Sequence, residues 1–204
     1  MRHICMLVFS LMFGASAYGQ NDKVVGSLGL FKFTQSTEGE NSNDVEVKTE
    51  TDYQFVHLGF CYVTNQICLG LRYLDATIVE KDTYSDANYE WANGTSSIKY
   101  SGFGVKIGFS GDIGLILHYS LMLTPTMVVE DARTWSESTV TYNVKNASII
   151  DVGYGFEVNN LRVGPLFSII DFAADTYDDD DEQDVESPRT DSFLAPHIAF
   201  WIDF

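Results

Sequence analysis

The feature that most constrains the fold is a strict alternation of apolar residues with small or polar ones. It runs through eight segments of about ten residues, the length that a tilted β-strand needs to cross a bilayer. The segments span residues 24–33, 52–63, 67–79, 98–109, 113–123, 148–158, 161–172 and 192–204. The alternation predicts eight β-strands, although Lys32 interrupts the first segment and leaves its two faces unassigned.

The connections between these segments alternate in length. Short turns follow the second, fourth and sixth segments, and long polar stretches follow the others, at residues 35–51, 80–97, 125–147 and 173–191. The long stretches hold 21 of the 29 acidic residues and 5 of the 12 basic ones, which is nearly all of the net charge of −17. This plan predicts an all-β fold, an eight-stranded antiparallel up-and-down transmembrane β-barrel.

Glycine distinguishes the two faces of the predicted strands. A strand face that meets water is typically rich in Lys, Glu and Thr. The less apolar face of this chain carries glycines and scattered charges instead, which suits a narrow interior, so we expect the Leu, Ile, Phe and Tyr face to meet lipid. The glycines are Gly59, Gly70, Gly102, Gly104, Gly108, Gly114, Gly153, Gly155 and Gly164.

The first residues have the layout of a secretory signal peptide. A short basic start precedes an apolar run, and Ala15-Ser16-Ala17 fits a cleavage site. We therefore expect a signal peptide at residues 1–17 and a single barrel domain at residues 18–204. The negative net charge argues against a nucleic-acid partner, because nucleic acids require Lys and Arg on a binding face.

The last segment, HIAFWIDF, places Ile198, Phe200, Ile202 and Phe204 on one face. With this strand and this plan, the chain resembles the small eight-stranded outer-membrane barrels of Gram-negative bacteria, of the OmpA-transmembrane and OmpX type. The resemblance implies that these four residues form the signal read by the outer-membrane assembly machinery. It also implies a structural, non-enzymatic role, in which the protein stabilises the membrane or contacts lipopolysaccharide or a host or prey cell.

Eight charged or titratable residues fall on the predicted interior face. The interior of an eight-stranded barrel is just wide enough for side chains to fill, and a charge buried there needs a partner. We expect a structural network of ion pairs, with a narrow, weakly conducting path for small solutes as the alternative. The residues are His57, Arg72, Lys106, His118, Asp151, Glu157, Arg162 and Asp203.

Pairing across the short turns predicts which interior residues lie opposite one another. Glu157 is expected opposite Arg162. Around the turn VTNQ, His57 is expected opposite Arg72, and Cys61 opposite Cys68. Directly opposed residues have Cα separations within the disulfide range, so the cysteines form either a disulfide or two small buried thiols.

The run DTYDDDDEQDVE, at 175–186, is the most acidic stretch of the chain. Its carboxylates suit loosely bound Ca²⁺ or Mg²⁺, although it lacks the glycine and the spacing of an EF-hand loop. A solvated loop is the competing interpretation, and no resident metal or cofactor is expected. The candidate cation ligands are Asp178, Asp179, Asp180, Asp181, Glu182, Asp184 and Glu186.

The sequence His118-Tyr119-Ser120 raises one enzymatic alternative, because the lipid A 3-O-deacylases are also eight-stranded barrels and carry an H-x-S pair. Residues two apart share a strand face, so a base and a nucleophile would be neighbours. However, the family's following Asn is missing, and the pair lies on the predicted interior face, away from a lipid substrate. We therefore expect no hydrolase activity.

Overall fold

Antiparallel strands make up almost all of the described part of the computed structural model, which comprises residues 23–40, 45–111, 114–133, 136–159, 161–178 and 184–203. One short 3₁₀ helix, η2 (Ala87–Ala92), lies between the third and fourth strands. None of the described residues forms a helix long and apolar enough to cross a membrane. The signal peptide predicted at residues 1–17 lies outside the described residues. The strands are β1 (Lys23–Glu40), β2 (Glu46–Thr64), β3 (Ile67–Tyr84), β4 (Gly94–Ser110), β5 (Leu115–Met122), β6 (Thr126–Arg133), β7 (Ser136–Tyr154), β8 (Phe156–Val158), β9 (Leu161–Asp178) and β10 (Asp184–Asp203).

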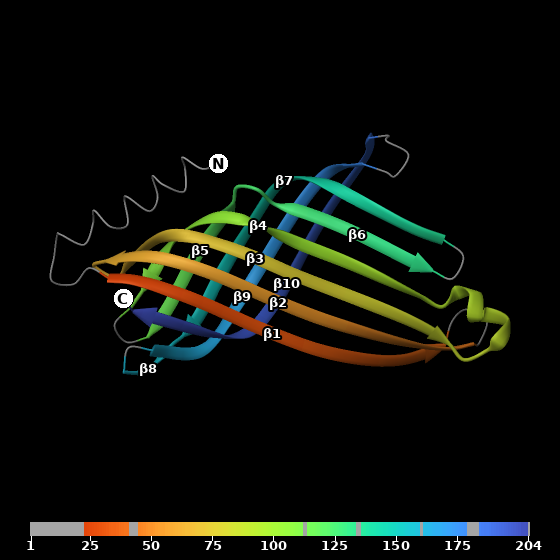
Figure 1. Ribbon diagram of the computed structural model, residues 1–204, viewed down its shortest axis with the longest axis horizontal. Helices are drawn as coiled ribbons and strands as arrows, with labels where there is room; N and C mark the ends of the chain where they lie inside the picture. Colours follow the sequence, from red (N-terminus) through yellow and green to blue (C-terminus); the bar gives the residue numbers. More distant parts are fainter. Residues whose placement is uncertain are drawn as a thin grey trace.

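The strands pair side by side in a closed ring with eight positions (Figure 1). β1 to β4 follow in order, β5 and β6 share the fifth position, β7 and β8 share the sixth, and β9 and β10 complete the ring. The seam between β1 and β10 is short: six residue pairs close it, from Val25↔Asp203 to Leu30↔Ile198. By comparison, β1 pairs with β2 along the whole of β1, from Lys23 to Glu40.

Ten strands occupy eight positions because two positions are each shared by two consecutive strands with a short interruption between them. Between β5 and β6, the amides of Leu123 and Thr124 both donate to the carbonyl of Phe103, at 2.7 and 3.2 Å. An extra residue that shares one partner in this way is a bulge, and Pro125, which has no amide hydrogen, follows it. Between β7 and β8, the amide of Gly155 leaves the ladder and donates to the carbonyl of Gly114 at 2.8 Å.

The strands are longer than predicted, and the expectation of long polar loops was wrong for much of their length. Residues 34–40 of β1 pair with residues 46–52 of β2, and this pairing continues through β3, β4, β6 and β7. Polar side chains do not prevent pairing, because the backbone hydrogen bonds of a strand do not depend on side-chain polarity. We call this part the extension; it comprises residues 34–40, 46–52, 79–84, 94–97, 130–133 and 136–139.

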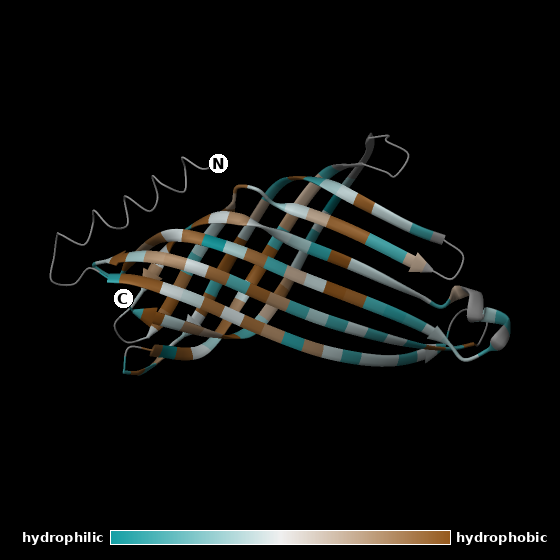
Figure 2. Cartoon of the chain, in the orientation of Figure 1, coloured by the Kyte–Doolittle hydropathy of each residue, from teal (hydrophilic) through white to brown (hydrophobic). Residues whose placement is uncertain are grey.

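Burial alternates along the ring, and large apolar side chains are exposed on its outer face. In β5, Leu115, Leu117, Tyr119 and Leu121 are exposed, whereas every second residue, including His118, is buried. Figure 2 shows the same alternation of hydrophobic and hydrophilic residues along the strands near the termini, and mostly hydrophilic colours on the far ends of β1 to β3. The less apolar face of this strand, which carries His118 and Ser120 together with Ile116 and Met122, is therefore the buried one, as predicted.

The turn between β2 and β3 has a different register from the predicted one. Asn65 and Gln66 have φ angles of 48° and 67°, and Thr64 pairs directly with Ile67. Two consecutive positive φ angles define a two-residue turn of type I′, whereas the prediction assumed a four-residue turn. The register is therefore shifted by two residues, and because side chains alternate with a period of two, no residue changes face.

Candidate functional site

A layer of polar side chains lies inside the ring, and each of its members is at most 5% exposed. Five of them belong to the interior network that the sequence predicts. We call this group the polar layer. It consists of His57, Arg72, Lys106, His118, Ser120, Asp151, Ser168 and His197.

The strongest interaction in the polar layer is the ion pair between Arg72 and Asp151. An Arg72 guanidinium nitrogen lies 2.5 Å from Oδ2 of Asp151, and the two side chains are 1% and 2% exposed. Ser168 donates to Oδ1 of the same carboxylate at 2.5 Å and accepts from Arg72 at 3.5 Å. A buried carboxylate with both oxygens engaged in this way is compensated by its neighbours.

The predicted position of Arg72 was correct in face but wrong in neighbour. Arg72 lies opposite Gly59 on β2 and Gly104 on β4, not opposite His57, because of the two-residue shift at the turn. Its partner Asp151 is on β7, two positions beyond β4 in the ring. The ion pair therefore spans the interior and connects opposite parts of the wall.

Lys106 is a second buried cation, and no carboxylate of the described residues lies within ion-pair distance of it. A Cβ built on Gly59 would lie 3.0 Å from Lys106 Nζ and 2.5 Å from Oγ of Ser27. Because Gly59 has no side chain, there is space for the ammonium group of Lys106 beside it. Lys106 also lies opposite Gly70 in β3, so glycines face it from two strands.

Two histidines fill the interior next to β1. The rings of His57 and His197 meet edge to face with centroids 5.0 Å apart. A Cβ on Gly29 would overlap both rings. Nδ1 of His197 lies 2.9 Å from the carbonyl oxygen of Ala195, which fixes the orientation of that ring.

Apolar clusters close the polar layer on both sides. Along β2, Cys61 belongs to one cluster, His57 lies in the polar layer, and Phe55 belongs to the other cluster. The lower cluster, at the end of the ring that carries the Asn65–Gln66 turn, contains Val25, Cys61, Val63, Cys68, Ile116, Leu166, Ala199 and Trp201. The upper cluster, toward the extension, contains Phe55, Leu74, Ala76, Tyr100, Met122, Met127, Ala147, Ile149, Ile170, Phe172 and Ala195.

Three of the predicted network residues lie at the lower rim, apart from the polar layer. Asp203 lies 2.5 Å from Nζ of Lys23 and 3.7 Å from the guanidinium of Arg162. Lys23 and Asp203 are partly exposed, whereas Arg162 is buried. The predicted pairing of Glu157 with Arg162 is confirmed in register. The predicted interior position of Glu157 is wrong. The strand β8 is only three residues long, and every residue in it, including Glu157, is exposed.

The two side chains of the H-x-S pair, His118 and Ser120, are not hydrogen-bonded to each other. Nε2 of His118 lies 3.0 Å from Oγ of Ser110, not from Ser120. Ser120 is fully buried, and its Oγ has no hydrogen-bond partner among the described residues. Asp151, which lies opposite His118, is engaged by Arg72 and Ser168. A lipid substrate outside the ring would not reach this serine.

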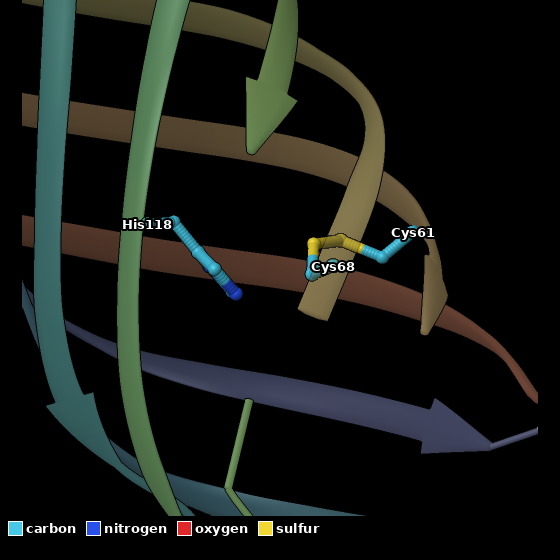
Figure 3. A group of neighbouring side chains, drawn as sticks. All are labelled: Cys61, Cys68 and His118. Carbon is cyan, nitrogen blue, oxygen red and sulfur yellow. A yellow bond between two sulfur atoms is a disulfide. The ribbon is translucent and has the colours of Figure 1, made fainter. Parts of the chain in front are cut away.

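Cys61 and Cys68 are joined in a disulfide with their Cα atoms 5.4 Å apart. The two residues are not directly opposite, since Cys61 pairs with Gly70 and Cys68 with Val63. The bond therefore connects diagonal neighbours on the interior face. Figure 3 shows His118 of β5 pointing toward this disulfide from the facing wall.

Some of the predicted cation ligands and C-terminal residues lie outside the described part of the structure. Asp179, Asp180, Asp181 and Glu182 are outside the described residues. The backbones of Asp178, Asp184 and Glu186 belong to β9 and β10, where Asp184 pairs with Asp178 and Glu186 with Thr176. Of the four residues predicted to form an assembly signal, Ile198 and Ile202 are exposed on the outer face and Phe200 is half-buried, whereas Phe204 is outside the described residues.

Three members of the polar layer were missing from the predicted network: Ser120, Ser168 and His197. Period-two counting places all three on the interior face, with Ser168 two residues after Leu166. Ser168 was overlooked because a serine is neither charged nor apolar, yet it completes the coordination of Asp151. No protein-family model and no curated protein matches the sequence.

Proposed function

We propose that the protein is an integral outer-membrane β-barrel with a sealed interior, which has a structural role and presents an acidic surface for contact outside the cell. The observation that carries this proposal is the band of large apolar side chains on the outside of a ring whose inside holds charges. Phe103 and Ile198, for example, are 61% and 56% exposed. A lipid bilayer is the environment that favours an apolar outer face around an interior that contains charges.

The energetics of the outer band support the proposal. Fully burying a side chain such as Leu or Phe contributes roughly 1.5–3 kcal/mol, and soluble monomers rarely expose apolar patches of more than a few hundred Å². Here the exposed apolar residues recur on β2, β3, β4, β5, β7, β9 and β10. In lipid the same band is favourable, and a closed ring leaves few unpaired backbone groups.

The sealed interior favours the structural role over the pore. A pore needs a continuous polar path, whereas the polar layer lies between two apolar clusters. Its main ion pair, Arg72–Asp151, also crosses the interior. We therefore propose that the charges brace opposite walls and that solutes do not pass.

The extension supports the role in surface contact. The 19 residues of β2 span about 60 Å at about 3.3 Å per residue, roughly twice the hydrocarbon thickness. The extension is strongly acidic, which suits bridging by divalent cations to lipopolysaccharide phosphates, or contact with another cell. Its acidic residues are Glu38, Glu40, Glu46, Glu50, Asp52, Glu80, Asp82, Glu130, Asp131 and Glu137.

Migration in detergent gels tests membrane insertion. We expect the unheated protein to migrate differently from the boiled protein, and to float with phospholipid vesicles after an alkaline wash. A monomer that is stable in buffer without detergent and stays out of vesicles would contradict the proposal.

Planar-bilayer recording tests the sealed interior separately. We expect small or absent conductance after insertion has been verified by flotation of the same preparation. A large, steady conductance would show that the clusters do not close the interior, while leaving the barrel itself in place.

A further inference from the structure

Three potential metal ligands meet inside the lower end of the ring. The Sγ atoms of Cys61 and Cys68 and a ring nitrogen of His118 all lie within 4.8 Å of one another (Figure 3). All three residues are buried, and they come from three different strands, β2, β3 and β5. Two sulfurs and one imidazole form the donor set that zinc takes in many proteins.

The spacing suits a tetrahedral ion once the sulfurs are free. Zinc binds sulfur at about 2.3 Å and imidazole nitrogen at about 2.0–2.1 Å, which places neighbouring ligand atoms about 3.5 Å apart. The present separations require only small side-chain movements to reach this arrangement. Ser110, whose Oγ lies 3.0 Å from Nε2 of His118, is close enough to orient the imidazole.

The charge of the surroundings selects the ion. The cysteines belong to the lower cluster, whose other members, among them Val63, Ile116 and Trp201, are apolar. A buried net charge is strongly unfavourable there. Two thiolates and a neutral imidazole balance the charge of one divalent cation, so the zinc-bound site carries no net charge.

We propose that Cys61, Cys68 and His118 form a redox-controlled zinc site, closed by the disulfide and opened by reduction. A dithiol reductant supplies two electrons: its two thiols become a disulfide, the bond between Cys61 and Cys68 breaks, and each cysteine sulfur gains one proton. Zinc then displaces these two protons and binds both thiolates and the imidazole. The site depends on the geometry of the ring and not on membrane insertion.

The test uses the full chain in detergent with zinc alone as the ligand. A trialkylphosphine reduces the disulfide, taking oxygen from water to become the phosphine oxide, and adds no competing thiol. Competition with a chromophoric chelator then gives the stoichiometry and affinity of zinc. We expect one tightly bound zinc per reduced chain and loss of this binding after reoxidation.

Matched variants assign the ligands. His118→Ala leaves the disulfide intact and should weaken zinc binding by more than about tenfold, since even outer-shell changes cost about 10–100-fold. His197→Ala removes a buried histidine outside the cluster and should leave zinc affinity unchanged. The double variant Cys61→Ser/Cys68→Ser controls for zinc bound by the acidic extension. Heat-modifiable migration verifies the fold of each variant.

Cobalt provides a measurement on the unmodified protein, independent of how the variants fold. Co²⁺ added to the reduced chain should give thiolate-to-cobalt charge-transfer absorption, and the oxidised chain should not. Equal zinc binding by reduced and oxidised protein, or by the double serine variant, would overturn the proposal. So would unchanged affinity in His118→Ala, or a cobalt spectrum without thiolate bands.

Discussion

Two ion pairs with almost the same geometry lie in different parts of this molecule. The N–O distance is 2.5 Å for Arg72–Asp151 inside the ring and 2.6 Å for Lys48–Glu50 on the extension. The side chains of the first pair are 1% and 2% exposed, whereas those of the second are 48% and 44% exposed. The N–O distance alone therefore does not indicate how much an ion pair contributes to stability.

The difference lies in what happens when one partner is removed. At the extension, water and salt screen the remaining charge. In the interior, the remaining charge stays in a low-dielectric region without compensation. The glycines follow the same division: a Cβ at Gly29 overlaps two histidine rings, whereas a Cβ at Gly39 meets nothing within 4 Å. The ring is therefore sensitive to substitution and the extension tolerant of it.

The largest expected effect comes from breaking the interior pair. Arg72→Met should lower the free energy of unfolding by about 3–5 kcal/mol, because it leaves Asp151 charged and buried. The matched variant Lys48→Met should leave the unfolding curve unchanged within error. Urea unfolding in detergent micelles measures both, and similar curves for the two variants would abolish the distinction between ring and extension.

Removing both interior charges should recover much of this loss. In Arg72→Met/Asp151→Leu no unpaired charge remains, so the double variant should be more stable than Arg72→Met by about 1–3 kcal/mol. Urea unfolding in the same micelles is the measurement. A double variant that is less stable than both single variants would mean that Ser168 and the shape of the layer matter more than its charge.

Gly29→Ala should destabilise the ring by about 1–3 kcal/mol, since the new methyl group forces His57 and His197 out of their packing. Gly39→Ala is the control in the extension and should change stability by less than about 0.5 kcal/mol. Both variants are measured by urea unfolding. If Gly39→Ala were the more disruptive of the two, the extension would be packed more tightly than its open surroundings indicate.

The smallest expected effect concerns the pH dependence of the exposed pair. Hydrogen bonding to Lys48 holds the pKa of Glu50 below its ordinary value. The stabilisation is therefore present above the ordinary pKa of a glutamate and disappears as the pH falls through the lowered one. Lys48→Met should raise the pKa of Glu50 in an NMR titration, whereas Lys81→Met, a weaker influence, should raise it less. An unmoved pKa in Lys48→Met would show that the two side chains do not interact in solution.

The sequence predicts much of the ring because the side-chain period of a strand is local. His118 and Lys106 are buried as period two requires, and the eight positions of the ring correspond to the eight predicted segments. The turn at Asn65–Gln66 was misjudged, since Asn-Gln lacks the glycine that usually marks a two-residue hairpin. The pairing of Arg72 with Asp151 was not predictable from turns, because the two residues are on strands that are not adjacent. The extension was missed because its polar composition is typical of loops.

The pairing of β1 with β10 determines when the ring can close during assembly. Its contacts join residues at opposite ends of the chain, such as Lys23 and Asp203, which are 180 positions apart. Most of the other strand pairs join neighbours along the chain, so those hairpins can form while later strands are still absent. Until β10 pairs with it, β1 has an unpaired edge to which a strand of another chain can bind. Pairing of β1 with β10 is therefore the last step of assembly. Before that step, a chaperone that covers the unpaired edge of β1 would prevent it from pairing with other chains.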